Sequence, residues 1–220
     1  GASPYTVSAN GQSAAFTSIP SIRGAGFNDS PIEFIFSDMS GNGLITDGSE
    51  AGTSTNITDA TYTGNSLGFP ASLNGRFYLA ANTAPHDEFF ASDALDGQTY
   101  GALAFASADE SIGDVLGLIP AKSALYALTS RSIEYWQTFD DATFPLRRVK
   151  GASLDAGVLP PDTVFNASNV VDVLYDTIGF LGYDSKVYLI EGGVLRRISD
   201  IDLAVKTDGD KNTISFCHFI

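Results

Sequence analysis

The sequence is poor in the side chains that most often carry out chemistry in proteins. It contains one cysteine, Cys217, and two histidines, His86 and His218. A single cysteine excludes an internal disulfide framework, and so few ligands cannot be arranged at the spacings of the usual tetrahedral zinc sites. A Ser-His-Asp triad would require one of the two histidines. We therefore expect no metal, no other cofactor and no enzymatic activity.

Basic residues are also scarce. The chain has 12 Lys and Arg against 26 Asp and Glu, which gives a formal net charge of −14. Proteins that bind nucleic acids tightly gather Lys and Arg, because these neutralise phosphates and release counterions. The basic residues here form two short clusters, Arg147-Arg148-Lys150 and Arg196-Arg197, which we interpret as surface positions on strands. The surface as a whole should repel duplex DNA and anionic membranes.

Long apolar runs are absent. No stretch approaches the ~18 residues of a membrane-spanning helix, and no secretory signal pattern begins the chain. We expect no association with a membrane. The first residue is not Met, and Gly1-Ala2-Ser3 is compatible with a piece of a longer protein.

Turn formers and aromatic residues are abundant. The chain has 22 Gly, 9 Pro, 15 Phe and 9 Tyr, and 44% of its residues are hydrophobic. This composition is typical of short aromatic strands joined by tight turns. The segment Asp109–Leu118 is the one place where we expect a helical turn, since acidic residues stand near its start.

A strand-turn-strand unit occurs four times. Aromatic residues mark the centre of its first strand, namely Phe34, Tyr78, Tyr126 and Phe180, and they recur at intervals of roughly 40–50 residues. A third strand is expected after three of the units, at Thr99–Phe105, Phe144–Val149 and Val194–Ser199. The two strands of each unit are expected at 32–36 and 43–46, 76–80 and 88–92, 124–128 and 133–137, and 177–182 and 187–190.

The length of this repeat indicates the fold class. Small antiparallel meanders with such a period are typical of the blades of a β-propeller, in which each blade covers the apolar face of its neighbour. We therefore predict an all-β chain that forms a β-propeller or part of one, with about four blades; a β-sandwich is the alternative. The expected domains are an irregular lead-in or incomplete blade (1–26), the blades (27–205) and a terminal hairpin or strand of a further blade (206–220).

The acidic residues leave one alternative function open. Glu134 shares a strand face with Trp136, an arrangement that some proteins use to stack sugars, so a carbohydrate-binding or carbohydrate-active propeller is the second hypothesis. The pairs Asp87-Glu88, Asp109-Glu110 and Asp140-Asp141 lie in or beside expected turns, where solvated acids are common. Asp208, Asp210 and Asn212 match the first half of a calcium loop, but Thr213 replaces its glycine, so we predict a hairpin turn without metal.

Several motifs occur in an order and spacing that resemble a phage family. They are Asn74–Phe77, Ser130–Trp136, Gly151–Gly157, Ile178–Gly182, and Val187–Leu189 followed by Arg197-Ile198-Ser199. The family is that of the tail-hub proteins of short-tailed double-stranded DNA phages, also called packaged-DNA stabilisation or nozzle proteins. Its members are about twice as long as this chain, which again indicates a piece of a longer protein.

The resemblance implies a structural component of the virion, made in the host cytoplasm. Copies of the hub, six in the family, form a ring below the portal and its adaptor, extend the DNA channel and carry the needle and tailspikes. An acidic protein suits this role, because few basic groups would hold the DNA that passes through the channel. Aromatic residues are enriched at protein interfaces, so Tyr135, Trp136 and Phe139 are candidate interface residues, although core packing between blades is the favoured role for at least two of them.

Overall fold

The computed structural model describes nine segments of the chain: 5–9, 12–16, 21–25, 32–47, 53–121, 124–141, 143–159, 164–166 and 177–199. The predicted terminal hairpin or strand at 206–220 lies outside the described residues, and so do Asp208, Asp210, Asn212, Cys217 and His218.

Four sheets of four strands form the body of the molecule, and within each sheet the strands follow sequence order. Blade A comprises β3 (Ser21–Ala25), β4 (Glu33–Ser37), β5 (Gly43–Asp47) and β6 (Ser54–Asn56). Blade B comprises β7 (Gly68–Leu73), β8 (Arg76–Ala80), β9 (Glu88–Asp93) and β10 (Asp96–Ser107). Blade C comprises β11 (Val115–Ala121), β12 (Ala124–Thr129), β13 (Ile133–Thr138) and β14 (Leu146–Arg148). Blade D comprises β15 (Phe165–Asn166), β16 (Thr177–Leu181), β17 (Val187–Glu191) and β18 (Val194–Arg197).

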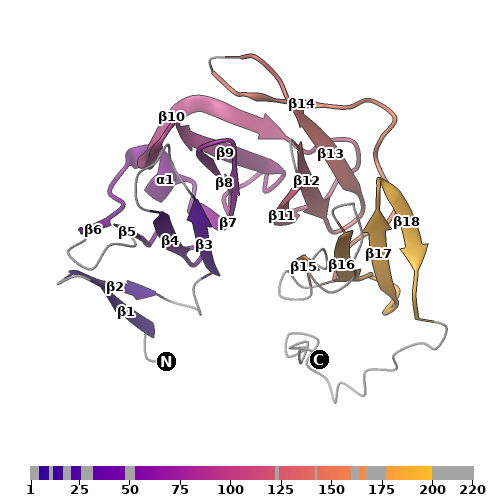
Figure 1. Cartoon of the computed structure of the whole chain (residues 1–220), viewed down its shortest axis with the longest axis horizontal. Helices are drawn as coiled ribbons and strands as arrows, with labels where there is room; N and C mark the ends of the chain where they lie inside the picture. The colour runs from indigo at the N-terminus through magenta and orange to yellow at the C-terminus, as the bar shows by residue number, and fades with distance from the viewer. Residues whose placement is uncertain are drawn as a thin grey trace.

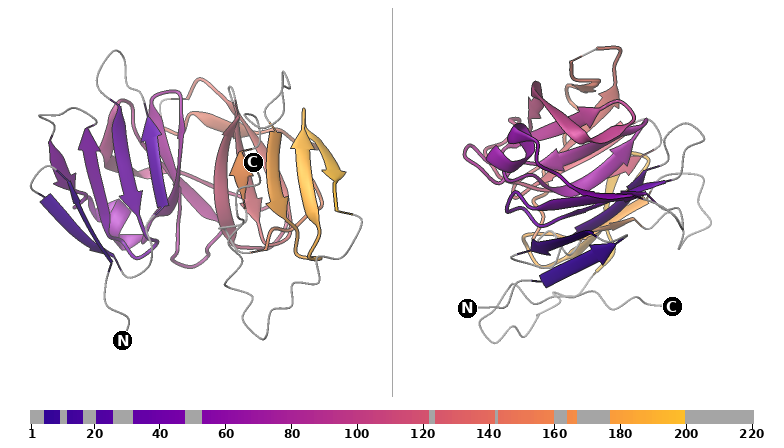
Figure 2. Two further views of the ribbon diagram at one scale, coloured as in Figure 1. Left: turned by 60° about the horizontal axis from the view of Figure 1, so that its bottom comes forward. Right: turned by 90° about the vertical axis from the view of Figure 1, so that its left-hand side faces the viewer.

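The blades follow one another along an arc, with the first strand of each on the inside and the fourth strand at the periphery (Figure 1). The inner strand β7 contacts the inner strands β3 and β11 on its two sides. Viewed from the side, the sheets stand next to one another like the blades of a propeller (Figure 2). The prediction of an all-β chain with propeller blades is confirmed.

Strand alternation explains how one strand contributes to two cores. In β8, Phe77 and Leu79 pack against blade A, whereas Tyr78 and Ala80 pack toward blade C. Successive side chains of a strand point to opposite faces, and both faces of this sheet are covered by a neighbouring sheet. The middle strands therefore need apolar residues at nearly every position, and β12 is buried along its whole length.

A hairpin covers the other face of blade A. It consists of β1 (Tyr5–Ala9) and β2 (Gln12–Phe16), which pair antiparallel. Phe16 is fully buried and packs with Ala14 against Leu44 of β5. The hairpin therefore occupies the position that a neighbouring sheet would take.

The described helix lies elsewhere than expected. It is α1 (Ala60–Gly64), between β6 and β7, and Asp59 caps it by accepting hydrogen bonds from the backbone of Thr61 and Tyr62. The expected helical turn at Asp109–Leu118 is wrong, because 109–114 is an irregular connection and β11 begins at Val115. Its backbone groups bond to other loops: Ser130 N donates to Asp114 O (3.2 Å) and Val115 N to His86 O (2.9 Å). No helix in the described part of the chain is long and apolar enough to cross a membrane.

Candidate docking groove and its anchor

Connections from three blades meet at one end of the molecule. The connection 109–114 leads from blade B to blade C, and the turn 130–132 joins β12 to β13. The described segment 151–159 follows β14, and the turn 182–186 joins β16 to β17. Backbone hydrogen bonds tie them together, from Ser130 N to Asp114 O (3.2 Å), from Val158 N to Thr129 O (3.0 Å) and from Tyr183 N to Gly157 O (3.0 Å). Three of the motifs that carry the family resemblance therefore border one place.

A groove of about 720 Å³ lies between these connections. Two apolar side chains are strongly exposed there, Ile112 at 92% and Tyr183 at 69%. Arg131 and Asp155 add one charge of each sign. The complete lining is Ser111, Ile112, Ser130, Arg131, Asp155, Gly157 and Tyr183. Such a surface can take an apolar side chain of a partner and pair with polar groups beside it.

Close backbone contact shapes the groove and depends on glycine. A Cβ atom at Gly157 would lie 2.1 Å from the carbonyl oxygen of Ser130, which is far inside van der Waals contact. A Cβ atom at Gly113 would lie 2.7 Å from Ser130 Oγ. The segment 151–159 can approach the turn 130–132 this closely only because Gly157 lacks a side chain, whereas at Gly113 rotation of the Ser130 hydroxyl would relieve the contact.

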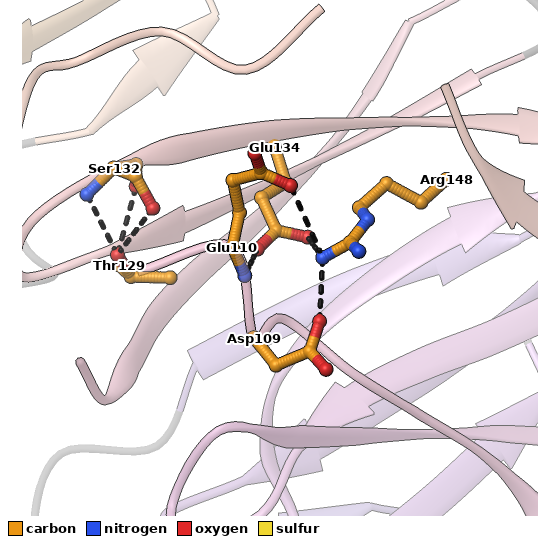
Figure 3. A network of polar contacts seen from close by, with 6 residues as sticks. All are labelled: Asp109, Glu110, Thr129, Ser132, Glu134 and Arg148. Atoms are coloured by element: carbon orange, nitrogen blue, oxygen red, sulfur yellow. Dashed lines mark hydrogen bonds and ion pairs between the residues drawn. The ribbon is translucent and has the colours of Figure 1, made fainter. Parts of the chain in front are cut away.

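An ion-pair network anchors the first of these connections (Figure 3). The Arg148 guanidinium of β14 contacts the carboxylates of Asp109, Glu110 (3.5 Å) and Glu134 (3.7 Å). The backbone N–H of Glu110 donates a 2.8 Å hydrogen bond to Glu134 Oε1. Strands β13 and β14 of blade C therefore hold the start of the connection whose later residues, Ser111 and Ile112, line the groove.

Burial controls the electrostatics of this anchor. The Glu134 side chain is 0% exposed, and burial raises the pKa of its carboxyl, while the Glu110 N–H and Arg148 act in the opposite direction. Burial lowers the pKa of Arg148, but the three carboxylates more than offset this and leave that pKa raised. Glu134 Oε2 and Trp136 Nε1 are buried without a hydrogen bond of regular geometry. Burial thus makes ionisation of the Glu134 carboxyl unfavourable, and the positive charge of Arg148 offsets part of this cost.

The three predicted interface residues lie in different environments. Trp136 is 7% exposed and meets the ring of Phe89 edge-to-face at 5.1 Å, so it belongs to the core between blades B and C. Tyr135 is half-buried, with its ring 5.1 Å from that of Tyr126. Phe139 is 47% exposed and lies under the guanidinium of Arg147 at 5.3 Å. Phe139 is the most exposed of the three, and the interface role of the set stays a prediction.

The geometry does not favour the carbohydrate hypothesis. Glu134 and Trp136 do share a strand face, but this face points into the blade B–blade C junction, where aromatic rings and Arg148 cover it. Asp109 and Glu110 are engaged by the same arginine. Among the described residues, no group of three His, Cys, Asp or Glu side chains is placed to hold a metal ion.

One pattern that is typical of hydrolases occurs in the sequence and was not among the predicted sites. Gly64-Asn65-Ser66-Leu67-Gly68 has the G-x-S-x-G spacing, and Ser66 has a φ of 50°. A nucleophile elbow runs from a strand through the turn into a helix, whereas this turn runs from α1 into β7. The pattern therefore lacks the structural context that the chemistry requires.

Comparison with known proteins gives one family model and a number of distantly similar structures. A family model described as "Bacteriophage P22 Gp10, beta-propeller" matches residues 1–203. No curated protein matches the chain. Among solved structures, the crystal structure of HIRA(644-1017) is similar at 11% identity and a TM-score of 0.37, over 82% of this chain and 57% of that one. PorZ, a surface component of the type-IX secretion system of Porphyromonas gingivalis, is similar at 16% identity and a TM-score of 0.34, over 86% of this chain and 28% of that one. The chain thus spans less than two thirds of either structure, and these likenesses carry no argument.

Proposed function

Because the chain belongs to the bacteriophage P22 Gp10 β-propeller family, we propose that it is a hub or nozzle protein of a phage tail. In this role it extends the portal channel, closes it to retain packaged DNA and docks other tail proteins. Family membership makes the chain a phage structural protein concerned with packaged-DNA stabilisation. The match over residues 1–203 is the observation that carries the proposal.

The groove supports the docking part of the proposal. Its rim exposes Ile112 and Tyr183, and large apolar side chains that are exposed together mark interaction sites. The connections that carry them are held by backbone hydrogen bonds and by the Arg148 network, so a partner would meet a preformed surface. A preformed surface loses less conformational entropy on binding. We propose that a needle, tailspike, portal or adaptor protein occupies it.

The distribution of basic groups supports passage of DNA without tight binding. Arg148, Lys186 and Arg196 each lie within 4.0 Å of a carboxylate, at Asp109, Asp184 and Glu191. A basic side chain next to a carboxylate attracts phosphate less, because the pair has little net charge. Closure of the channel by protein, rather than a grip on phosphates, would then retain the genome. In this proposal the protein acts in the virion as a ring of copies, after synthesis in the host cytoplasm.

A complementation experiment tests the proposed function. A phage whose gene for this protein is interrupted should fill its heads and then lose the genome during purification. The complete gene supplied in trans should restore DNA-filled particles, measured as genome copies per particle. Mutant particles that keep their genomes and infect normally would contradict the proposal.

Two variants test the groove in the same assay. Ile112→Asp places a charge on the apolar rim and should reduce the yield of infectious particles at least about tenfold, since docked apolar side chains dominate binding energy. Val194→Asp is the matched control, because Val194 is also exposed (66%) but lies on β18, outside the groove lining. Equal yields from both variants would show that the groove is not a docking site.

A further inference from the structure

The outer strand of blade B differs from the outer strands of the other three blades. Strands β6 and β14 have 3 residues each and β18 has 4, and the last two carry arginines. Strand β10 has 12 residues, and its stretch Gly97–Ser107 contains neither a charged residue nor proline. Proteins normally shorten or charge an exposed sheet edge, because its free N–H and C=O groups can pair with another chain. The outer strands of blades A, C and D are short, whereas that of blade B is long and uncharged and is interrupted only by bulges.

A bulge in β10 turns an apolar side chain outward. Tyr100 pairs with Ser92 and Phe105 pairs with Phe90, so residues 101–104 lie opposite Ala91 alone. Leu103, within this bulge, is 75% exposed. A bulge redirects side chains, and here the redirected leucine contributes little to the core of its own blade.

A second exposed apolar residue lies next to Leu103. Phe105 is 36% exposed, and its ring stacks on the buried ring of Phe90 with centroids 5.3 Å apart. The stacking holds the Phe105 ring in one orientation, so little side-chain entropy would be lost if a partner covered it. Leu103 and Phe105 thus form an exposed apolar ridge on β10, the strand that lies at the periphery of blade B (Figure 1).

We propose that this edge of blade B is an interface between two copies of this chain, with Leu103 and Phe105 at its centre. The proposal goes beyond the proposed function, because pairing of one edge with its own copy is two-fold, whereas a ring joins two different surfaces of each copy. Two copies repel one another, because each has a formal net charge of −14. A contact between them is least unfavourable along an edge without charge, and Gly97–Ser107 is such an edge. A basic partner would instead favour an acidic edge.

The size and position of the edge fit such a contact. Strand β10 has one neighbour in its sheet, β9, so its other edge is not paired within blade B. Strand β10 runs along the six residues of β9, a length of about 20 Å, because its bulges take up the rest of its 12 residues. Edge-to-edge contact over part of that length, with the apolar ridges against each other, combines main-chain hydrogen bonds with burial of apolar surface. The same surface serves both copies, so the contact is self-complementary.

Sedimentation velocity of the 220-residue chain over roughly a thousandfold range of concentration tests the proposal. The wild type should change from a 23.2 kDa species to one of twice that mass as concentration rises. Higher salt should strengthen the association, since it screens the repulsion between acidic copies. Leu103→Asp and Phe105→Asp should each raise the dissociation constant of the association at least about tenfold. Val194→Asp, an equally polar change on another exposed strand, should leave the dissociation constant unchanged.

Circular dichroism of each variant establishes that it is folded. If an aspartate variant is unfolded, Leu103→Ser replaces it in the same measurement. A wild type that stays at 23.2 kDa throughout, or a folded Leu103 variant that associates as the wild type does, would overturn the proposal. This outcome would leave the genome-retention experiment unaffected. Conversely, particles that keep their genomes without the protein would refute the tail function and not the contact between copies.

Discussion

Replacement of Trp136 tests whether the junction of blades B and C is held by an aromatic core. Trp136 is 7% exposed and makes edge-to-face contacts with Phe89 at 5.1 Å and Phe144 at 6.4 Å. Truncation of a buried tryptophan removes apolar contacts and leaves a cavity, which costs about 3–5 kcal/mol. Trp136→Ala should therefore lower the free energy of unfolding by about this amount. The loss is a large fraction of the stability of an ordinary domain.

A second substitution separates packing from hydrogen bonding. Trp136 Nε1 makes no hydrogen bond of regular geometry, although its N–H lies close enough to the Glu134 carboxylate to lower the pKa of that group, so Trp136→Phe removes ring atoms and at most this weak polar contact. Its cost should be about 1–2 kcal/mol. Phe139→Ala is the exposed control, and we expect it to cost less than about 1 kcal/mol, because Phe139 is 47% exposed.

Urea unfolding followed by far-ultraviolet circular dichroism provides the measurement. Fluorescence is unsuitable, because Trp136 is the one tryptophan in the chain. If Trp136→Ala lies within about 1 kcal/mol of the wild type, the ring does not hold the two blades together and our account of this core is wrong.

Two further predictions concern the groove and its anchor. Gly157→Ala should destabilise the fold by more than about 2 kcal/mol in thermal unfolding, because the added Cβ would lie 2.1 Å from the Ser130 carbonyl oxygen. Gly64→Ala is the control: its Cβ would have no neighbour within 4 Å, so its stability should stay within about 1 kcal/mol of the wild type. Equal effects of the two substitutions would refute the close contact at Gly157. Folding raises the pKa of Glu134 above its ordinary 4.5, so ionisation costs more in the folded state, and the wild type should lose stability relative to Glu134→Gln as pH rises from about 4 through the raised pKa. Melting temperatures of both proteins across this range check the sign, and a pH-independent difference would contradict it.

The middle strands of each blade could be predicted from the sequence, whereas the inner strands could not. Segments such as Arg76–Ala80 and Ala124–Leu128 are apolar at nearly every position because both faces are covered, and this produces a strong local signal. The inner strands β7 and β11 contain Gly68, Pro70 and Pro120, which suggest turns when the sequence is read locally. Tertiary packing explains why such residues occur in these strands. A Cβ at Gly68 would lie 2.5 Å from the Met39 side chain, so the close approach of that neighbouring segment selects glycine there.

The groove could not be predicted for the same reason. Ile112 and Tyr183 stand in polar connections without periodicity, and contacts between blades bring them together. The sequence did indicate that Glu134 and Trp136 share a face, because residues i and i+2 of a strand do so. What covers that face, Phe89 and Arg148, comes from other strands, and it decides that the pair is structural rather than sugar-binding.

The packing of each blade against the next has a consequence for how the molecule opens. In the described part of the chain, the clusters that join blades each link two consecutive sheets, so the stability is close to a sum of nearest-neighbour terms. Amide protons of β8 and β12, in sheets flanked on both sides, should exchange with solvent most slowly, and those of the hairpin β1–β2 much faster. The hairpin can then detach as a separate unit while the junction of blades B and C stays closed. Local opening at one end would leave the anchor of the groove intact.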